Sequence, residues 1–85
     1  MYKFHLSNDA EQTYWWLLKR DRALFERIRT ALERLQTDPH LGKRLVGPGK
    51  RWSLRVGAYR ILYRIERREL LIYVIDIGHR GTIYR

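Results

Sequence analysis

Arginine side chains recur at alternate positions in two stretches of the C-terminal half of the chain. In the first stretch Arg51 and Arg55 alternate with apolar residues, so they fall together on one face of a predicted strand. In the second stretch Arg60 and Arg64 have the same spacing as polar residues on one face. The guanidinium group binds phosphate through two parallel hydrogen bonds and stacks on nucleic-acid bases. This spacing therefore predicts a sheet surface that binds a phosphate-bearing anion.

A polar loop follows the most apolar stretch of the sequence. Residues 70–77 are nearly all apolar, which predicts a strand that is covered on both faces and central in the sheet. The sequence then reads Gly78-His79-Arg80-Gly81, so an imidazole and a guanidinium arrive at the end of that strand. Functional groups commonly lie on loops at strand ends, so His79 and Arg80 are candidate site residues.

The net charge of +9 is distributed unevenly along the chain. Residues 1–39 carry seven cations and six acids, whereas residues 40–85 carry eleven cations and three acids. A concentrated positive field on a small domain is typical of proteins that bind polyanions, most often nucleic acids, because each neutralised phosphate releases counterions. An acidic protein partner would fit the same field. The C-terminal half is therefore the predicted interaction surface.

Length and composition narrow the class of protein. A chain of 85 residues forms one domain, residues 1–85, and leaves no volume for a large cofactor pocket. There is no cysteine, and the three histidines are too far apart to indicate a metal site, so we expect neither a metal nor a cofactor. No apolar run reaches the roughly 20 residues of a membrane span, and the first residues do not resemble a signal peptide. We expect a cytoplasmic protein without membrane contact.

One strand and two helices are expected to support the cationic surface. Alternation over Tyr2–Leu6 predicts a strand that joins the sheet at an edge or as a parallel neighbour. Residues 7–9 are all of types that cap helices, and Asn8 stands three residues before a glutamate, the spacing of a capping box, so a first helix is predicted to begin here. Asp21 then caps a second helix that runs to about Gln36, because apolar residues recur there every three or four positions.

The order of these elements predicts the fold class. Trp15 and Trp16 are neighbours on a helix and diverge by about 100°, so we expect one of them to be exposed. Residues 41–51 are rich in glycine and cations and are predicted to form a mobile basic loop. Strand, helix, helix and three strands together predict an α+β fold, in which a small, mainly antiparallel sheet carries a two-helix hairpin on one face.

The sequence VGAYRILYRI, followed by LLIYVIDIGHRGTIYR, resembles the RelE/ParE superfamily of type II toxins, and more closely its RelE branch. The helical hairpin, the basic LGKRLVG loop and the WSLRVGAYR turn stand in the order of that family over essentially the whole chain. The resemblance implies a RelE-like β-α-α-β-β-β fold and a ribosome-dependent endoribonuclease that cuts messenger RNA in the A site. It also implies a cognate acidic antitoxin, similar to RelB, that silences the toxin.

The resemblance also assigns roles to individual residues. Arg60 and Arg80 match the phosphate-stabilising arginines of the family. Tyr84 matches its C-terminal tyrosine, and Arg51 matches a basic position on the strand after the loop. Ser53 departs from the pattern, because it stands where a RelE-like enzyme can have a lysine.

Cleavage of RNA without a metal ion has three chemical requirements. A base must take the proton from the 2′-OH, cations must stabilise the phosphorane, and an acid must protonate the 5′ oxygen. Tyr84 and His79 are both candidates for the proton acceptor, and Arg60 and Arg80 would stabilise the phosphate. Arg51 would hold the scissile phosphate or assist the leaving group. Five further cations of this half are expected to bind RNA, namely Lys43, Arg44, Lys50, Arg55 and Arg64.

The competing prediction is a toxin or binding module without enzymatic activity. The ParE branch shares the fold and poisons DNA gyrase without cleaving RNA, and a basic module that binds nucleic acid or protein would carry the same charge. The sequence discriminates only through Tyr84 and the loop at residues 78–81. The joint presence of Arg60, Arg80 and Tyr84 favours RNA cleavage, with the ribosome and messenger RNA as partners.

Overall fold

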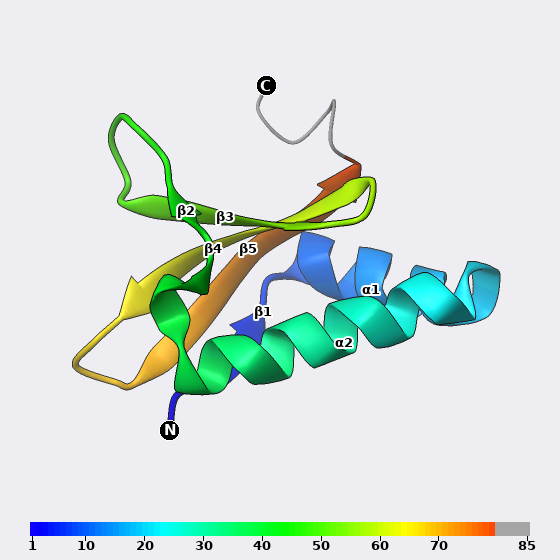
Figure 1. The fold of residues 1–85 in the computed structure, drawn as a ribbon, viewed down its shortest axis with the longest axis horizontal. Helices are drawn as coiled ribbons and strands as arrows, with labels where there is room; N and C mark the ends of the chain where they lie inside the picture. Colours follow the sequence, from blue (N-terminus) through cyan, green and yellow to red (C-terminus); the bar gives the residue numbers. More distant parts are fainter. Residues whose placement is uncertain (80–85) are drawn as a thin grey trace.

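A five-stranded sheet with a helical hairpin on one face makes up residues 1–79, the part of the chain that the computed structural model describes (Figure 1). One strand precedes the hairpin, and four strands follow it. The elements are β1 (Lys3–Leu6), α1 (Asn8–Arg20), α2 (Arg22–Thr37), a 3-10 helix (Pro39–Leu41), β2 (Lys43–Arg44), β3 (Arg51–Val56), β4 (Tyr59–Glu66) and β5 (Leu71–His79). This arrangement confirms the α+β fold class predicted from the sequence.

The strands lie in the order β1-β5-β4-β3-β2. β1 pairs in parallel with β5, and the other three pairs are antiparallel. The first strand is therefore a parallel neighbour at one edge, as its alternation predicted. β4 lies in the middle of the sheet, so its side chains alternate between the helical layer and the open face.

Side-chain caps determine where both helices begin. Ser7 is the N-cap of α1: its Oγ accepts a hydrogen bond from the backbone nitrogen of Ala10 at 3.1 Å and donates one to the carbonyl oxygen of Ile75 at 2.6 Å. The expected cap at Asn8 is wrong by one position, because Asn8 is already the first helical residue. Asp21 caps α2, as predicted, by accepting a bond from a backbone N–H of the first turn at 3.1 Å.

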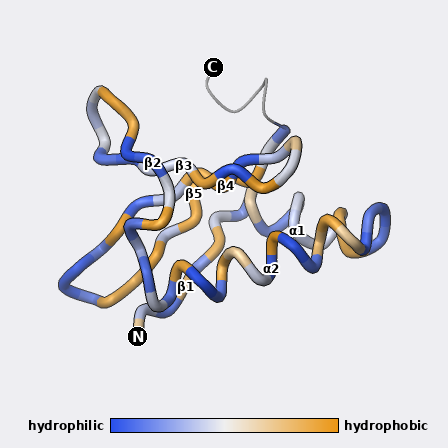
Figure 2. Tube along the Cα trace, viewed as in Figure 1, coloured by the Kyte–Doolittle hydropathy of each residue, from blue (hydrophilic) through white to orange (hydrophobic). Residues whose placement is uncertain are grey.

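One apolar core lies between the hairpin and the sheet. Hydropathy rises and falls along both helices, as expected of helices that bury one side (Figure 2). The helices contribute Ala10, Tyr14, Leu17, Phe25, Ile28, Ala31, Leu32 and Leu35, and the strands contribute Val56, Ile61, Tyr63, Ile72, Val74 and Ile77. None of the helices within residues 1–79 has the length and apolar character needed to cross a membrane.

Two expectations about burial are wrong. Trp15 and Trp16 are both about half exposed, at 49% and 51%. Both lie on the side of α1 that points away from its buried stripe and from the sheet. The apolar run of residues 70–77 is not covered on both faces. Ile72 and Val74 are buried, but their neighbours in β5 on the other face are partly exposed, since helices cover only one side of the sheet. The strand is nevertheless interior, with β1 and β4 on its two sides.

The segment predicted as a mobile loop, residues 41–51, is held against the sheet at its start. It contains β2, which pairs with β3. The hydroxyl of Tyr63 donates a hydrogen bond to the carbonyl oxygen of Pro39 at 2.8 Å and accepts one from the backbone nitrogen of Gly42 at 3.1 Å. A Cβ at Gly42 would lie 2.7 Å from that hydroxyl, so a larger residue does not fit without a shift. Burial raises the pKa of Tyr63 to about 12, so the phenol stays protonated and able to donate at alkaline pH values where an exposed tyrosine ionises.

Candidate functional site

The register of β3 and β4 places four arginines on the open face of the sheet in two facing pairs. Arg55 is the cross-strand partner of Arg60, and Arg51 is the partner of Arg64. Antiparallel partners project to the same side, and the residues between them along each strand face the helices. The two pairs are four residues apart, which corresponds to about 13 Å along a strand. The four arginines predicted from alternation therefore share one face, as expected.

These facing pairs cost the fold stability. Like charges that stand directly opposite each other destabilise a sheet. Arg64 is partly compensated, because its Nε lies 3.2 Å from a carboxylate oxygen of Glu66 and its guanidinium lies 5.0 Å from the ring centre of Tyr73. Within residues 1–79 no carboxylate is within ion-pair distance of Arg51 or Arg55. A bound anion would relieve this repulsion, so the face is suited to a phosphate group.

Arg60 is the most enclosed cation of this face. Its side chain is half-buried, and its Nη1 donates a hydrogen bond of 3.3 Å to the Oγ of Ser53. Ser53 is only 3% exposed, so its hydroxyl is a fixed acceptor that holds the guanidinium in place. On the β5 side the cross-strand partner of Arg60 is Gly78, which has no side chain to occupy the adjacent space. The hydrogen bond to Ser53 and the strand register thus position Arg60 on the open face.

His79 lies on the other side of the sheet from Arg60. It is the cross-strand partner of Tyr59, and the two rings meet edge to face with centroids 5.8 Å apart. Both residues line a small cavity against α1 that also includes Trp16. The structure therefore does not bring the imidazole onto the face that carries the arginine pairs. Within residues 1–79 no three side chains of the metal-binding types gather closely enough to hold a metal ion.

Two predicted catalytic residues, Arg80 and Tyr84, lie outside the described residues. The structure instead adds Asp76 to the open face. Asp76 is the cross-strand partner of Leu62, one pair along from Arg60 and Gly78, and its Oδ1 accepts a hydrogen bond of 2.9 Å from the next backbone nitrogen. The signal in the sequence was a single charged residue within an apolar run, which we interpreted as part of a strand covered on both faces.

The predicted RNA-binding cations are divided between the two sides of the sheet. Lys43 in β2 is the partner of Ser53 and so joins the open face with Arg51 and Arg55. Arg44 is the partner of Trp52, which packs against the core, so it projects to the opposite side. Lys50 precedes β3 in a left-handed conformation, with φ of 48°, and lines a cavity together with Arg44.

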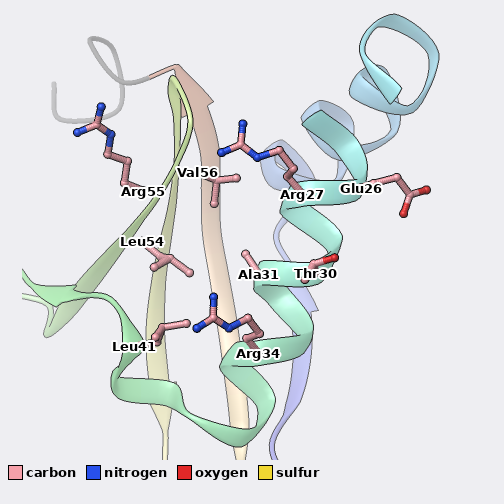
Figure 3. Close-up of a pocket in the computed structure, with 9 residues that line it drawn as sticks. All are labelled: Glu26, Arg27, Thr30, Ala31, Arg34, Leu41, Leu54, Arg55 and Val56. Carbon is pink, nitrogen blue, oxygen red and sulfur yellow. The ribbon is translucent and has the colours of Figure 1, made fainter. Parts of the chain in front are cut away.

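A groove of about 470 Å³ separates α2 from β3 (Figure 3). Its lining is apolar at the bottom, where Ala31, Leu41, Leu54 and Val56 lie. Arg27 and Arg34 extend from α2 into the space between helix and strand, whereas Glu26 turns away from it (Figure 3). Glu26 is held there by ion pairs with two other arginines of α2. The groove is therefore apolar and positively charged.

Comparisons with known proteins agree with this architecture. Residues 7–84 match the family model of the ParE toxin of the type II toxin–antitoxin system parDE. No curated protein sequence matches the chain. Three solved structures illustrate the similarity in fold, and each covers more than nine-tenths of both chains.

The toxin–antitoxin complex RelBE of E. coli aligns with a TM-score of 0.80 and 20% identity, over 93% of this chain and 96% of that chain. The RelBE2 complex of Mycobacterium tuberculosis aligns with a TM-score of 0.79 and 23% identity, over 93% and 98%. The YoeB/ParE toxin of Agrobacterium tumefaciens aligns with a TM-score of 0.80 and 20% identity, over 91% and 96%. Because the family model covers most of the sequence and these folds agree, the chain belongs to the ParE toxin family of type II toxin–antitoxin systems, within the RelE/ParE superfamily.

Proposed function

We propose that the protein is a toxin that cleaves messenger RNA in the ribosomal A site without a metal ion, and that its open sheet face is the active face. The observation that carries the proposal is the pair of facing arginines, Arg55 and Arg60, on a face where no ion pair to Arg55 exists within residues 1–79. A fold that maintains such repulsion is suited to stabilising the charge that develops on a phosphorane.

The groups of this face divide the steps of the reaction. The 2′-oxygen attacks the phosphorus and the 5′ oxygen leaves, while Arg60 holds the non-bridging oxygens. Arg80 supplies a second guanidinium, and Tyr84 supplies a phenol that protonates the leaving 5′ oxygen; both residues are assigned from the sequence. Asp76 is the open-face carboxylate one strand pair along from Arg60 and is a candidate to take the proton from the 2′-OH, whereas Glu66 on the same face is paired with Arg64. Arg51 holds a neighbouring phosphate of the same strand.

The placement of His79 changes its role in this proposal. Its ring faces α1 and Tyr59 rather than the arginine pairs, so a proton transfer at Arg60 would need Asp76 or Tyr84 instead. With so few titratable groups on the face, the ribosome must orient the 2′-OH for in-line attack. We therefore expect slow cleavage of free RNA and fast cleavage of translated messages.

The direct test of this function is primer extension on translated messages after the protein is induced. Cleavage within codons, together with arrested growth, is the expected result. A matched pair of variants assigns the cleavage to the open face: Arg55→Ala should reduce it, whereas Arg22→Ala, which removes the same charge from an exposed position of α2, should not. Growth arrest with intact messages would contradict the proposal.

The second candidate is a toxin that poisons DNA gyrase without cutting RNA. The match to the family model of ParE, rather than to a model of an RNA-cleaving toxin, favours it. A supercoiling assay with purified gyrase separates the two functions. Inhibition of supercoiling with intact messages would assign the cationic face to a protein or DNA target.

The proposed partner is an acidic antitoxin, and the groove between α2 and β3 is the surface that fits a segment of it. RelBE of E. coli and RelBE2 of Mycobacterium tuberculosis are toxin–antitoxin complexes of the same fold. An apolar floor flanked by Arg27 and Arg34 suits a segment that alternates apolar and acidic residues. Affinity should fall with rising salt and should weaken in an Arg34→Ala variant. An affinity that does not change with salt would contradict this electrostatic contribution.

A further inference from the structure

A second cavity, of about 610 Å³, lies near the turn that joins β4 to β5 and takes no part in the proposed cleavage step. Trp52 and His40 contribute aromatic surface to it, and their rings meet edge to face with centroids 5.1 Å apart at 73°. Its volume is within the range of small-molecule sites, about 300–1,000 Å³. The cavity therefore has the size and the aromatic lining that a nucleotide requires.

The ring of Trp52 is held in place by a second aromatic ring, that of Tyr63. The two rings stack with centroids 6.4 Å apart and planes 24° apart. Tyr63 is fully buried and its hydroxyl makes two hydrogen bonds, so it cannot turn away. An indole fixed in this way is a stacking platform that does not have to be ordered when a base binds. Base stacking on an aromatic side chain contributes about 1–3 kcal/mol per base.

Cations from three separate elements surround this platform. One comes from β2, one from the loop before β3 and two from the turn between β4 and β5: Arg44, Lys50, Arg67 and Arg68. In the described part of the chain, none of the four has a carboxylate within ion-pair distance. Aromatic rings within a ring of cations are typical of sites for single-stranded nucleic acid.

Two carboxylates also line the cavity, Glu66 and Glu69. Glu66 is held by the Nε of Arg64 at 3.2 Å, so part of its charge is already neutralised. The cavity retains more positive than negative charge. Its polar character distinguishes it from the α2–β3 groove, whose apolar floor suits a peptide, and favours a nucleotide as the occupant.

The cavity lies at the end of the strands, and it meets the cationic face at the turn between β4 and β5, because Trp52 and Arg44 lie on the helix side of the sheet. From Arg60 the chain passes Arg64, the partner of Arg51, and three residues later reaches Arg67. The step from Arg60 to Arg64 is about 13 Å at the rise of a strand. An RNA strand held at Arg60 would therefore pass the second arginine pair and cross the β4–β5 turn before it reaches the platform on the other side of the sheet.

We propose that this cavity binds one unstacked nucleotide of single-stranded RNA, with its base on Trp52 and its flanking phosphates on Arg67 and Arg68. The proposal rests on the proposed function in that the ligand is the RNA whose scissile phosphate lies at Arg60. It adds a site that holds the substrate away from the reacting bond and so selects RNA that is single-stranded over several nucleotides.

The test uses the full chain with Trp15→Phe and Trp16→Phe, so that Trp52 is the only tryptophan. The probe is a hexanucleotide with 2′-O-methyl groups, which cannot be cleaved. Saturating probe should quench the fluorescence of Trp52. The double variant Arg67→Ala with Arg68→Ala should weaken binding and reduce the slope of log K against log salt by about 1.4, since each single-strand phosphate contact contributes about 0.7.

A matched control separates this site from the general positive field. The double variant Lys19→Ala with Arg20→Ala removes the same charge from the end of α1, and it should leave the quench and the salt slope unchanged. Trp52→Leu, followed by anisotropy of a labelled probe, should weaken binding about tenfold with an unaltered slope. If this variant fails to fold, the quench of Trp52 and the arginine double variant still decide.

Each contrary outcome has a distinct meaning. Equal weakening by the two double variants, or saturation of the probe without a quench, overturns the proposal. A quench by an oligoglutamate peptide but not by RNA overturns it in favour of a protein partner. Cleavage of translated messages is measured in parallel. Cleavage without a quench contradicts only the nucleotide site, and a quench without cleavage contradicts only the proposed function.

Discussion

The helix-covered face and the open face of the sheet are built from the same strands and differ in what their side chains satisfy. On the covered face the strand residues are apolar and buried against the hairpin, and the polar group of Tyr63 makes both of its hydrogen bonds. On the open face arginine stands opposite arginine. One face lowers the free energy of folding, and the facing arginines of the other raise it. Substitutions on the two faces should therefore separate stability from activity.

The largest effect is expected on the covered face. Leu32 of α2 is fully buried, so Leu32→Ala should lower the free energy of unfolding by about 2–5 kcal/mol through lost burial and a residual cavity. Denaturant titration measures this loss. The matched change on the open face, Arg55→Ala, should stay within about 0.5 kcal/mol, because the side chain is exposed. It should even be slightly stabilising, since it removes the repulsion of Arg60. Equal destabilisation by both variants would contradict the division between the faces.

The next effect is expected in activity rather than in stability. Arg60→Ala should remove about 3 kcal/mol of transition-state stabilisation, on the order of a hundredfold in rate, because a fixed guanidinium at the phosphorane is lost. Single-turnover cleavage on programmed ribosomes measures the rate, and thermal melting should remain close to that of the parent protein. Arg60→Lys should recover part of the activity, since it restores the charge but not the two parallel donors. If Arg60→Ala remains fully toxic and melts normally, the catalytic assignment is wrong.

The fold and the cationic face were predictable from the sequence because both follow from the short-range periodicity of apolar and charged residues. Alternation in β3 and β4 places Arg51, Arg55, Arg60 and Arg64 on one side whatever the rest of the chain does. The side of His79 was not predictable in the same way. It depends on the register between β4 and β5, where the pairing shifts at Leu62 and Tyr63, and on the continuation of β5 through His79.

Features that depend on contacts between layers were also missed. A strand of two residues such as β2 has no period to detect, and it forms because Tyr63 holds the preceding loop. Trp15 and Trp16 are both exposed because they lie away from the buried stripe of α1, whereas only one exposed tryptophan was expected. The stacking platform at Trp52 was not predicted, because alternation gives the side of a residue and not whether its outer edge is covered.

Tyr63 holds the segment before β2 against the sheet, and this contribution to stability should depend on pH. Tyr63→Phe removes two hydrogen bonds from a buried site, with an expected cost of about 1–2 kcal/mol in unfolding free energy. The pKa of Tyr63 is raised from 10.0 to about 12 in the folded protein, so its contribution to stability is complete below pH 10 and is lost as the pH rises towards 12. Denaturant titrations between pH 9 and about 12 should show a steeper loss of stability in the parent protein than in the Phe variant. Equal slopes would mean that the phenol is accessible to water in the folded state.

The smallest expected effect tests how the helical layer is attached to the sheet. Ser7→Ala should lower the free energy of unfolding by about 1 kcal/mol, because it removes the cap of α1 and the hydrogen bond to the carbonyl oxygen of Ile75 in β5. Asn8→Ala, one residue along, should change it by only a few tenths, about 0.3 kcal/mol, because Asn8 lies within the helix and caps nothing. Thermal melting of the two variants side by side gives the comparison. Ile75 is the residue of β5 that the change of register between β4 and β5 skips. Ser7 donates its hydrogen bond to the carbonyl oxygen of this residue. If Asn8→Ala proves the more harmful of the two, the capping box expected from the sequence describes the start of α1 better than the cap at Ser7.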